Sequence, residues 1–122
     1  MAEKRRAARV VERVREEVAR SLAREIRDPR VVGVVVTRVE MPDDLQLATI
    51  YVRLEQGGDD PAARKLAMKG LASTTPKLRR SVGARLGMRY APELRFHYDE
   101  GVDAKTRVEE LLHEIKSEKG ED

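Results

Sequence analysis

The chain has 122 residues, with 25 lysines and arginines, 22 aspartates and glutamates, and no cysteine. This length suits one domain with a modest hydrophobic core, and the lack of cysteine excludes a disulfide scaffold, a cysteine-ligated zinc finger and a thiol nucleophile. No apolar run exceeds three residues, as in Val34–Val36, whereas a membrane span needs about 20. The charged start, Met1–Arg6, is not followed by the apolar segment of a secretory signal, so we expect a cytoplasmic protein.

Charge is unevenly distributed along the chain. Residues 61–90 carry eight basic side chains and no acidic one, whereas residues 28–60 carry three basic and seven acidic ones. Residues 1–27 carry nine basic and five acidic side chains, and residues 91–122 carry five and ten. A stretch of this length without a carboxylate predicts a polyanionic partner, which we expect to be nucleic acid.

Residues 4–27 are predicted to form a helix. Apolar side chains recur there at spacings of three and four, at Val11, Val14, Val18, Leu22 and Ile26. Asp28-Pro29 is expected to end this helix, because the residue before a proline is driven out of the helical region.

A hairpin of two antiparallel strands is predicted next, over Val31–Glu40 and Gln46–Glu55, with a turn at Met41–Asp44. In the first strand the two-residue period places Val32, Val34 and Val36 on one face, and Val31, Val35 and Val39 on the other. Apolar residues on both faces predict a central or well-covered strand. In the second strand Ala48, Ile50, Val52 and Leu54 are expected to face the core.

A kinked helical unit is predicted over residues 61–91. Asp60 is a suitable N-cap and Pro61 a suitable first residue. Pro76 cannot donate a hydrogen bond to the Ala72 carbonyl, so we expect two helical pieces joined by a kink or a tight turn near residues 73–76, with Thr74 or Thr75 capping the second. A third strand follows at Glu93–Asp99, with Leu94, Phe96 and Tyr98 on its core face. A last helix, capped by Asp103, would carry the stripe Val108, Leu111, Leu112 and Ile115.

The expected fold class is α+β, in the order α-β-β-α-kink-α-β, with a three-stranded sheet covered by helices on one face. This order is similar to the KH domain of the second topological type. Residues 1–102 would form the KH-like RNA-binding domain, and residues 103–122 the C-terminal helix and charged tail.

The candidate RNA-binding residues lie in two groups. The first group lies on the kinked helical unit, where a helix N-terminus and basic side chains can bind phosphate. Its members are Lys65, Lys69, Ser73, Thr74, Thr75, Lys77, Arg79, Arg80, Arg85 and Arg89. Lys77, Arg80 and Arg85 are expected to project outward. The second is an auxiliary group at the start of the first helix: Lys4, Arg5, Arg6 and Arg9. Elsewhere on that helix interleaved acids predict ordinary surface pairing, as between Glu16 and Arg20.

Other signals favour binding over catalysis. Only four aromatic residues occur, and two of them, Phe96 and Tyr98, are predicted to be in the core. This argues against recognition of RNA by base stacking and favours recognition of its backbone and shape. Gly83 and Gly87, four residues apart, predict a close approach by another element. The two histidines, His97 and His113, have no ligand spacing around them, so we expect no metal, cofactor or catalytic centre.

The chain resembles the ribosome-binding factor A family over roughly residues 5–112. The most specific matching segments are Arg24–Arg30 and Pro92–Asp99. Weaker matches are Val39–Met41, Asp44-Leu45 with Ala48, Tyr51-Val52, and Leu78-Arg79 with Leu86. The resemblance implies a KH-like fold in which an Ala-x-Gly kink replaces the GxxG loop. Here Ala72-Ser73-Thr74 lacks that glycine, and Pro76 is expected to break the helix instead.

The resemblance also implies a function. It predicts a monomeric, non-enzymatic assembly factor that binds the small (30S) ribosomal subunit and its 16S rRNA, and that serves late maturation of the rRNA 5′ end, especially in the cold. Two alternatives stay open. One is a generic RNA- or DNA-binding module without ribosome specificity. The other is a protein-interaction domain that pairs through its first helix or the Val108–Ile115 stripe.

Overall fold

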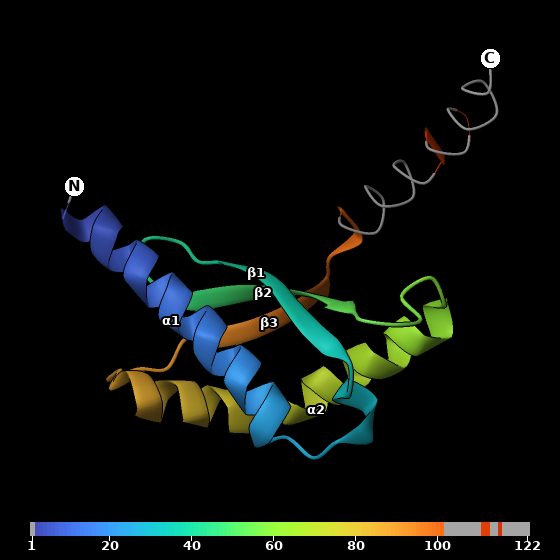
Figure 1. Cartoon of the computed structure of the whole chain (residues 1–122). Helices are drawn as coiled ribbons and strands as arrows, with labels where there is room; N and C mark the ends of the chain where they lie inside the picture. The colour runs from blue at the N-terminus through green and yellow to red at the C-terminus, as the bar shows by residue number, and fades with distance from the viewer. Residues whose placement is uncertain (1, 102–110, 113–114, 116–122) are drawn as a thin grey trace.

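The computed structural model describes residues 2–101, 111–112 and 115, with residues 2–4 described by their backbone alone (Figure 1). Leu111, Leu112 and Ile115 are helical and exposed. The rest of the predicted C-terminal helix and tail, including Asp103 and Val108, lies outside the described residues. Among those described, no helix is both long and apolar enough to cross a membrane.

Helix α1 spans Ala2–Arg24, so it ends three residues earlier than the sequence predicts. The Ser21 carbonyl accepts hydrogen bonds from the N–H groups of both Glu25 and Ile26, which closes the last turn. Asp28 then caps a separate short helix, η1 (Pro29–Val31), by accepting a hydrogen bond from the Arg30 N–H. The sequence pattern placed Val31 in the first strand, but this residue belongs to η1.

Strand β1 (Val34–Glu40) pairs antiparallel with β2 (Leu47–Leu54), which confirms the hairpin. The ladder shifts between Val36 and Arg38, where a bulge changes the alternation of side chains. Val39 thus opposes the buried Ile50 and packs on the core, on the same face as Val34 and Val36. The prediction that Val39 faces the other way is wrong, because the two-residue period does not continue through a bulge.

Strand β2 is the centre of the sheet. The order is β1-β2-β3, and β3 (Glu93–Tyr98) runs parallel to β2. Strand β1 is therefore an edge strand, so of the two predicted alternatives, a central or a well-covered strand, the central one is wrong. The face of β2 that carries Ala48, Ile50 and Val52 is buried, as predicted. Both helices cover this face of the sheet, and within residues 2–101 no helix covers the other face, called the open face below (Figure 1).

Helix α2 runs without a break from Pro61 to Leu86, so the two predicted helical pieces form one element. Asp60 is the N-cap, as predicted, and its carboxylate accepts a hydrogen bond from the Ala62 N–H. Pro76 lies inside the helix, where it removes one hydrogen bond to the preceding turn. The ribbon changes direction near its middle (Figure 1), which is the expected effect of an internal proline.

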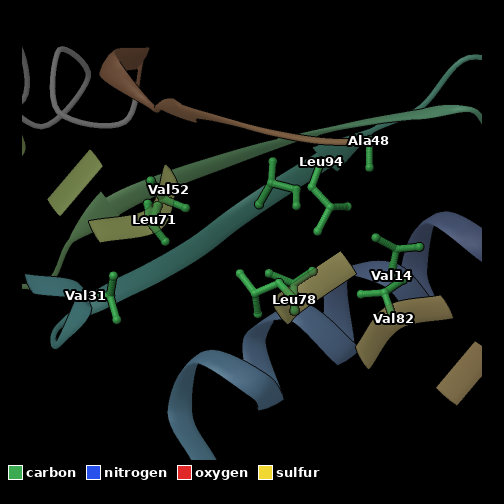
Figure 2. Packing of buried hydrophobic residues seen from close by; sticks show 10 residues of the cluster. Val14, Val31, Ala48, Val52, Leu71, Leu78, Val82 and Leu94 are labelled. Carbon is green, nitrogen blue, oxygen red and sulfur yellow. The ribbon is translucent and has the colours of Figure 1, made fainter. Parts of the chain in front are cut away.

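The hydrophobic core lies between the two helices and the sheet. Figure 2 shows side chains from α1, α2 and the strands pointing into this space, among them Val14, Leu78 and Leu94. Leu71 and Leu78 lie on either side of Pro76 and are both fully buried. The packing of both halves of α2 holds the helix continuous through the proline. Gly70 allows η1 to pack closely, since a Cβ there would lie 2.7 Å from the Arg30 Cβ.

Candidate nucleic-acid interface

An open groove of about 1060 Å³ lies between the first half of α1 and the chain at the C-terminal end of α2. Its lining includes five arginines: Arg6, Arg9 and Arg13 from α1, and Arg79 and Arg89 from α2 and the turn after it. The carboxylates of Asp44 and Glu93 also line it. The groove therefore has an excess of positive charge, and it joins members of two basic groups that lie far apart in the sequence.

The turn after α2 shapes one wall of this groove. Gly87 ends the helix in the left-handed conformation, with φ of 62°, and its N–H donates back to the last turn. Gly83 packs against Ala91, since a Cβ on Gly83 would lie 3.0 Å from the Ala91 Cβ. The predicted close approach is thus confirmed at Gly83 and is wrong at Gly87, where a Cβ would meet nothing within 4 Å. The guanidinium of Arg79 donates to the Ala91 carbonyl at 3.1 Å. The wall is thus held at both ends.

A second basic surface lies on the outer side of α2. Lys65, Lys69, Ser73 and Arg80 are exposed and follow one another at helical spacing, so they share the face opposite the core. Within the described part of the chain, Lys65, Lys69 and Arg80 make no ion pair. These residues do not line the groove. The structure therefore separates the predicted ridge into two surfaces, the arginine groove and this outer row.

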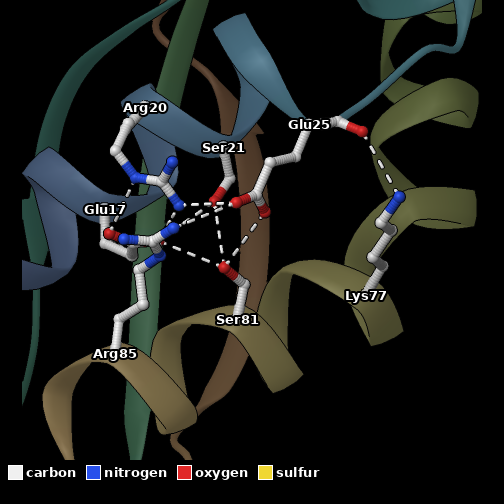
Figure 3. A network of polar contacts seen from close by, with 7 residues as sticks. All are labelled: Glu17, Arg20, Ser21, Glu25, Lys77, Ser81 and Arg85. Atoms are coloured by element: carbon white, nitrogen blue, oxygen red, sulfur yellow. Dashed lines mark hydrogen bonds and ion pairs between the residues drawn. The ribbon is translucent and has the colours of Figure 1, made fainter.

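Arg85 was predicted to project outward; its side chain is 52% exposed, but its guanidinium is paired with acidic groups of the chain. Its guanidinium lies against α1, 3.2 Å from a Glu17 carboxylate oxygen and 3.4 Å from one of Glu25 (Figure 3). Arg20 holds the same two carboxylates, each at 2.7 Å. The sequence analysis did not predict this pairing, because Glu17 lies inside α1 and Glu25 directly after it, and both are about 60 residues or more from Arg85 along the chain. Arg20 itself pairs with Glu17, and not with Glu16 as the helical spacing had suggested.

Two serines connect this ionic network to the core. The Ser81 hydroxyl lies 3.1 Å from a Glu17 carboxylate oxygen and 3.3 Å from one of Glu25, either of which can accept its single proton. Its oxygen also lies 3.2 Å from that of Ser21, which is fully buried. Glu17 is itself buried at 8% exposure. Figure 3 shows α1 and α2 side by side at this point, bridged by these polar groups. The network fastens the two helices that form the walls of the groove.

The carboxylates of the network have lowered pKa values. The pKa of Glu17 lies below its ordinary value chiefly because Arg20 hydrogen-bonds the ionised form, an effect larger than the opposing effect of burial; Ser81 and Arg85 lower the pKa further by smaller amounts. The pKa of Glu25 is lowered in the same way, again chiefly by Arg20. Arg20 accordingly has a raised pKa. These three groups are therefore charged at neutral pH.

The remaining predicted site residues have other local roles. Thr74 and Thr75 lie within α2, and their hydroxyls donate to the Leu71 carbonyl at 3.0 and 2.8 Å, so neither caps a second helix. Lys77 is exposed, and its ammonium donates to the Glu25 carbonyl at 3.3 Å. Arg5 is exposed outside the groove lining, and the Lys4 side chain lies outside the described residues.

The structure adds two features that the sequence prediction omitted. Arg13 follows Arg6 and Arg9 at spacings of three and four, so one face of α1 carries all three, and this periodicity was the signal that could have found it. On the open face of the sheet the Arg38 guanidinium lies 3.9 Å from the ring centre of Tyr51, and the His97 ring on β3 lies 6.0 Å from the same centre. Among the described residues, no group of acidic or histidine side chains has the arrangement of a metal site.

Comparison with known proteins identifies the family. The family model of ribosome-binding factor A matches residues 6–112. Ribosome-binding factor A of Sorangium cellulosum is 54% identical over 111 residues, which cover 91% of this chain and 89% of that protein.

Structures of ribosome-binding factor A from another organism show the same fold. The crystal structure of ribosome-binding factor A from Thermus thermophilus aligns with a TM-score of 0.65 at 21% identity, over 75% of this chain and 92% of that one. A homology model of the Thermus thermophilus factor, fitted into a cryo-electron-microscopy map of its complex with 30S, aligns at 0.59 and 20% identity, over 73% of this chain and 90% of that one. With the family model spanning most of its length, this chain belongs to the ribosome-binding factor A family.

Proposed function

We propose that this protein binds the small ribosomal subunit by laying the arginine groove against phosphates of 16S rRNA. The observation that carries the proposal is the convergence of five arginines, from α1 and from the end of α2, on one open groove. Guanidinium groups suit phosphate because they present several donors in a planar fork. Family membership supports the choice of partner, since the Thermus thermophilus relative is described in a complex with 30S.

We further propose a biological role from the family resemblance. The protein acts in the cytoplasm as a monomer without catalysis, and its binding serves late maturation of the 16S rRNA 5′ end, above all at low temperature. This role is tested by depleting the protein from a cell that depends on it. Depletion should cause 16S precursors with unprocessed 5′ ends to accumulate more strongly in the cold, and equal accumulation at all temperatures would remove the cold-specific part of the role.

The interface is tested by two triple variants that each remove three positive charges. The groove variant is Arg6→Gln/Arg9→Gln/Arg13→Gln, and the matched control is Lys65→Gln/Lys69→Gln/Arg80→Gln on the outer row. All six side chains are exposed, so both variants should stay folded. Circular dichroism checks this before binding is measured.

The assay is co-sedimentation with purified mature and immature small subunits across a salt series. Each phosphate contact that is lost should reduce the magnitude of the slope of log affinity against log salt concentration by about 0.7 to 0.9. We expect the groove variant to lose up to three such contacts and the control to lose fewer. A groove variant that binds like the wild type, beside a control that fails, would move the interface to the outer row.

Competition separates this proposal from a generic RNA-binding module. Excess unrelated RNA duplex should leave small-subunit binding largely intact, because binding to one assembled site uses shape as well as charge. Complete displacement by the duplex would favour the generic module. Binding that persists in high salt, together with a defined dimer, would favour the protein-interaction domain, since apolar contacts are not screened.

A further inference from the structure

Tyr90 stands out among the aromatic side chains of the described chain. It is 76% exposed, whereas Tyr51, Phe96 and Tyr98 are each at least partly buried. It lies in the lining of the arginine groove, and the Arg89 guanidinium lies 5.5 Å from the centre of its ring. A large ring left open to water beside a cluster of cations has no role in the core packing described above.

The backbone that carries Tyr90 is anchored on both sides. Gly87 closes α2 before it, and Met88 donates its N–H to the Gly83 carbonyl at 3.0 Å. After it, Ala91 packs against Gly83 and accepts the hydrogen bond from Arg79, and Pro92 is fully buried. The ring is therefore presented from a short segment that is fixed in the fold. Ordering such a ring on binding costs little entropy.

We propose that the groove holds an unpaired RNA nucleotide, with its base stacked on Tyr90 and the adjoining phosphates bound by the arginines of α1. The proposal deepens the function proposed above and rests on it. Bases in a duplex have both faces covered by their neighbours, so an exposed aromatic ring can stack only on a base that is unpaired or at an end. The cations for the phosphates are available, since Arg6, Arg9 and Arg13 make no ion pair within the described part of the chain.

The open face of the sheet is the rival platform, and its chemistry is less suitable. The ring of Tyr51 is already covered by Arg38 at 3.9 Å. Arg38 is itself paired with Glu40 at 2.8 Å, and Arg95 is paired with Glu93 at 3.4 Å. On that face the ring is covered and both Arg38 and Arg95 are paired with carboxylates, whereas the groove has an open ring and arginines in excess of acids.

The absence of tryptophan from the chain allows a direct test. Tyr90→Trp introduces a single indole at the proposed platform. The probe is a single-stranded oligoadenylate of about ten nucleotides, within the usual site sizes for such strands, and the comparison is the same strand paired with oligouridylate. We expect the single strand to quench the fluorescence of the indole by stacking and the duplex to leave it largely unchanged.

Affinity measurements complete the test. Tyr90→Ala should weaken binding of the single strand about 5- to 150-fold, the range for loss of one stacked base, while Tyr90→Phe should bind nearly as the wild type does. Because the side chain is exposed, neither variant should alter the fold. Equal affinity of Tyr90→Ala and wild type, or equal quenching by strand and duplex, would overturn the proposal.

The outcomes also separate this inference from the function on which it rests. If Tyr90→Ala binds the oligonucleotide normally while Arg6→Gln/Arg9→Gln/Arg13→Gln fails on the small subunit, the groove binds backbone alone and the stacking proposal is wrong. If the single strand quenches the indole but the wild type does not bind small subunits, the stacked site stands and the ribosomal function fails. A lack of any oligonucleotide binding at low salt overturns the stacking proposal directly.

Discussion

Two leucines on α2 provide a matched test of how this fold is held together. Leu78 follows Pro76 by two residues and is fully buried in the core, whereas Leu66, in the first half of the same helix, is 53% exposed. Each is replaced by alanine. The two changes alter the same atoms in the same element, so any difference in stability comes from their burial.

The expected magnitudes follow from that burial. Removing three buried carbons costs about 2.4 kcal/mol of transfer free energy, and the cavity left behind brings Leu78→Ala to about 3–5 kcal/mol. Leu66→Ala loses about half of the transfer free energy and leaves no closed cavity, so about 1 kcal/mol is expected. Unfolding entropy scales with chain length, so 1 kcal/mol corresponds to about 4 °C for a domain of this size.

Urea and thermal unfolding followed by circular dichroism measure both variants. Leu78→Ala should lower the Tm by about 12 to 20 °C and Leu66→Ala by about 4 °C. The slope of unfolding free energy against urea concentration should be the same in each variant as in the wild type. An unchanged slope would show that the variants expose the same surface on unfolding. Equal losses for the two variants would refute the packing described for the second half of α2.

Three further predictions concern the helix contacts. Gly70→Ala places a Cβ 2.7 and 2.9 Å from side-chain atoms of η1, so the urea midpoint should fall; a rise, as helix propensity alone predicts, would contradict the close contact. Ser81→Ala removes a hydroxyl bonded to Glu17 and should cost about 1 kcal/mol, whereas Ser73→Ala on the exposed face should cost under about 0.5 kcal/mol; urea unfolding compares them. Arg20 lowers the pKa of Glu17 in the folded state, so ionised Glu17 stabilises the fold. This contribution is fully present above the ordinary carboxyl pKa of 4.5 and is lost as the pH falls through the lower pKa of the folded state. On acidification the unfolding free energy of Glu17→Gln should therefore fall less than that of the wild type. An equally steep fall in the two proteins would show that Glu17 is not the source of the acid sensitivity.

Periodicity predicted the elements well because backbone geometry alone determines which side chains share a face. The alternation over Ala48, Ile50 and Val52 identified a strand with one buried face, and the structure buries all three. Asp60 followed by Pro61 marked the start of α2 correctly, since capping depends only on neighbouring residues.

The same local rules failed where a distant residue contributes. The bulge in β1 lies at Thr37, whose hydroxyl donates to the buried Asp99 at 2.6 Å, a partner 62 residues away. The valines around Thr37 in the sequence give no indication that Asp99 will be its partner. Pro76 was expected to join two helical pieces by a kink or a tight turn. The helix does change direction near its middle (Figure 1), but burial of Leu71 and Leu78 on either side of Pro76 keeps it continuous. In both cases tertiary contacts outweigh the local preference.

By itself, the sequence determined the class of elements, the core residues of the central strand, the family resemblance and the excess of cations in residues 61–90, because these depend on composition and short-range spacing. Only the tertiary structure decided which cations act together. It brings Arg6, Arg9 and Arg13 to the same groove as Arg79 and Arg89, and it turns Arg85 onto the carboxylates of Glu17 and Glu25. Charges along a chain can be counted from the sequence, but whether a guanidinium lines a groove or pairs with a carboxylate depends on how α1 and α2 cross, and that is set by the core between them.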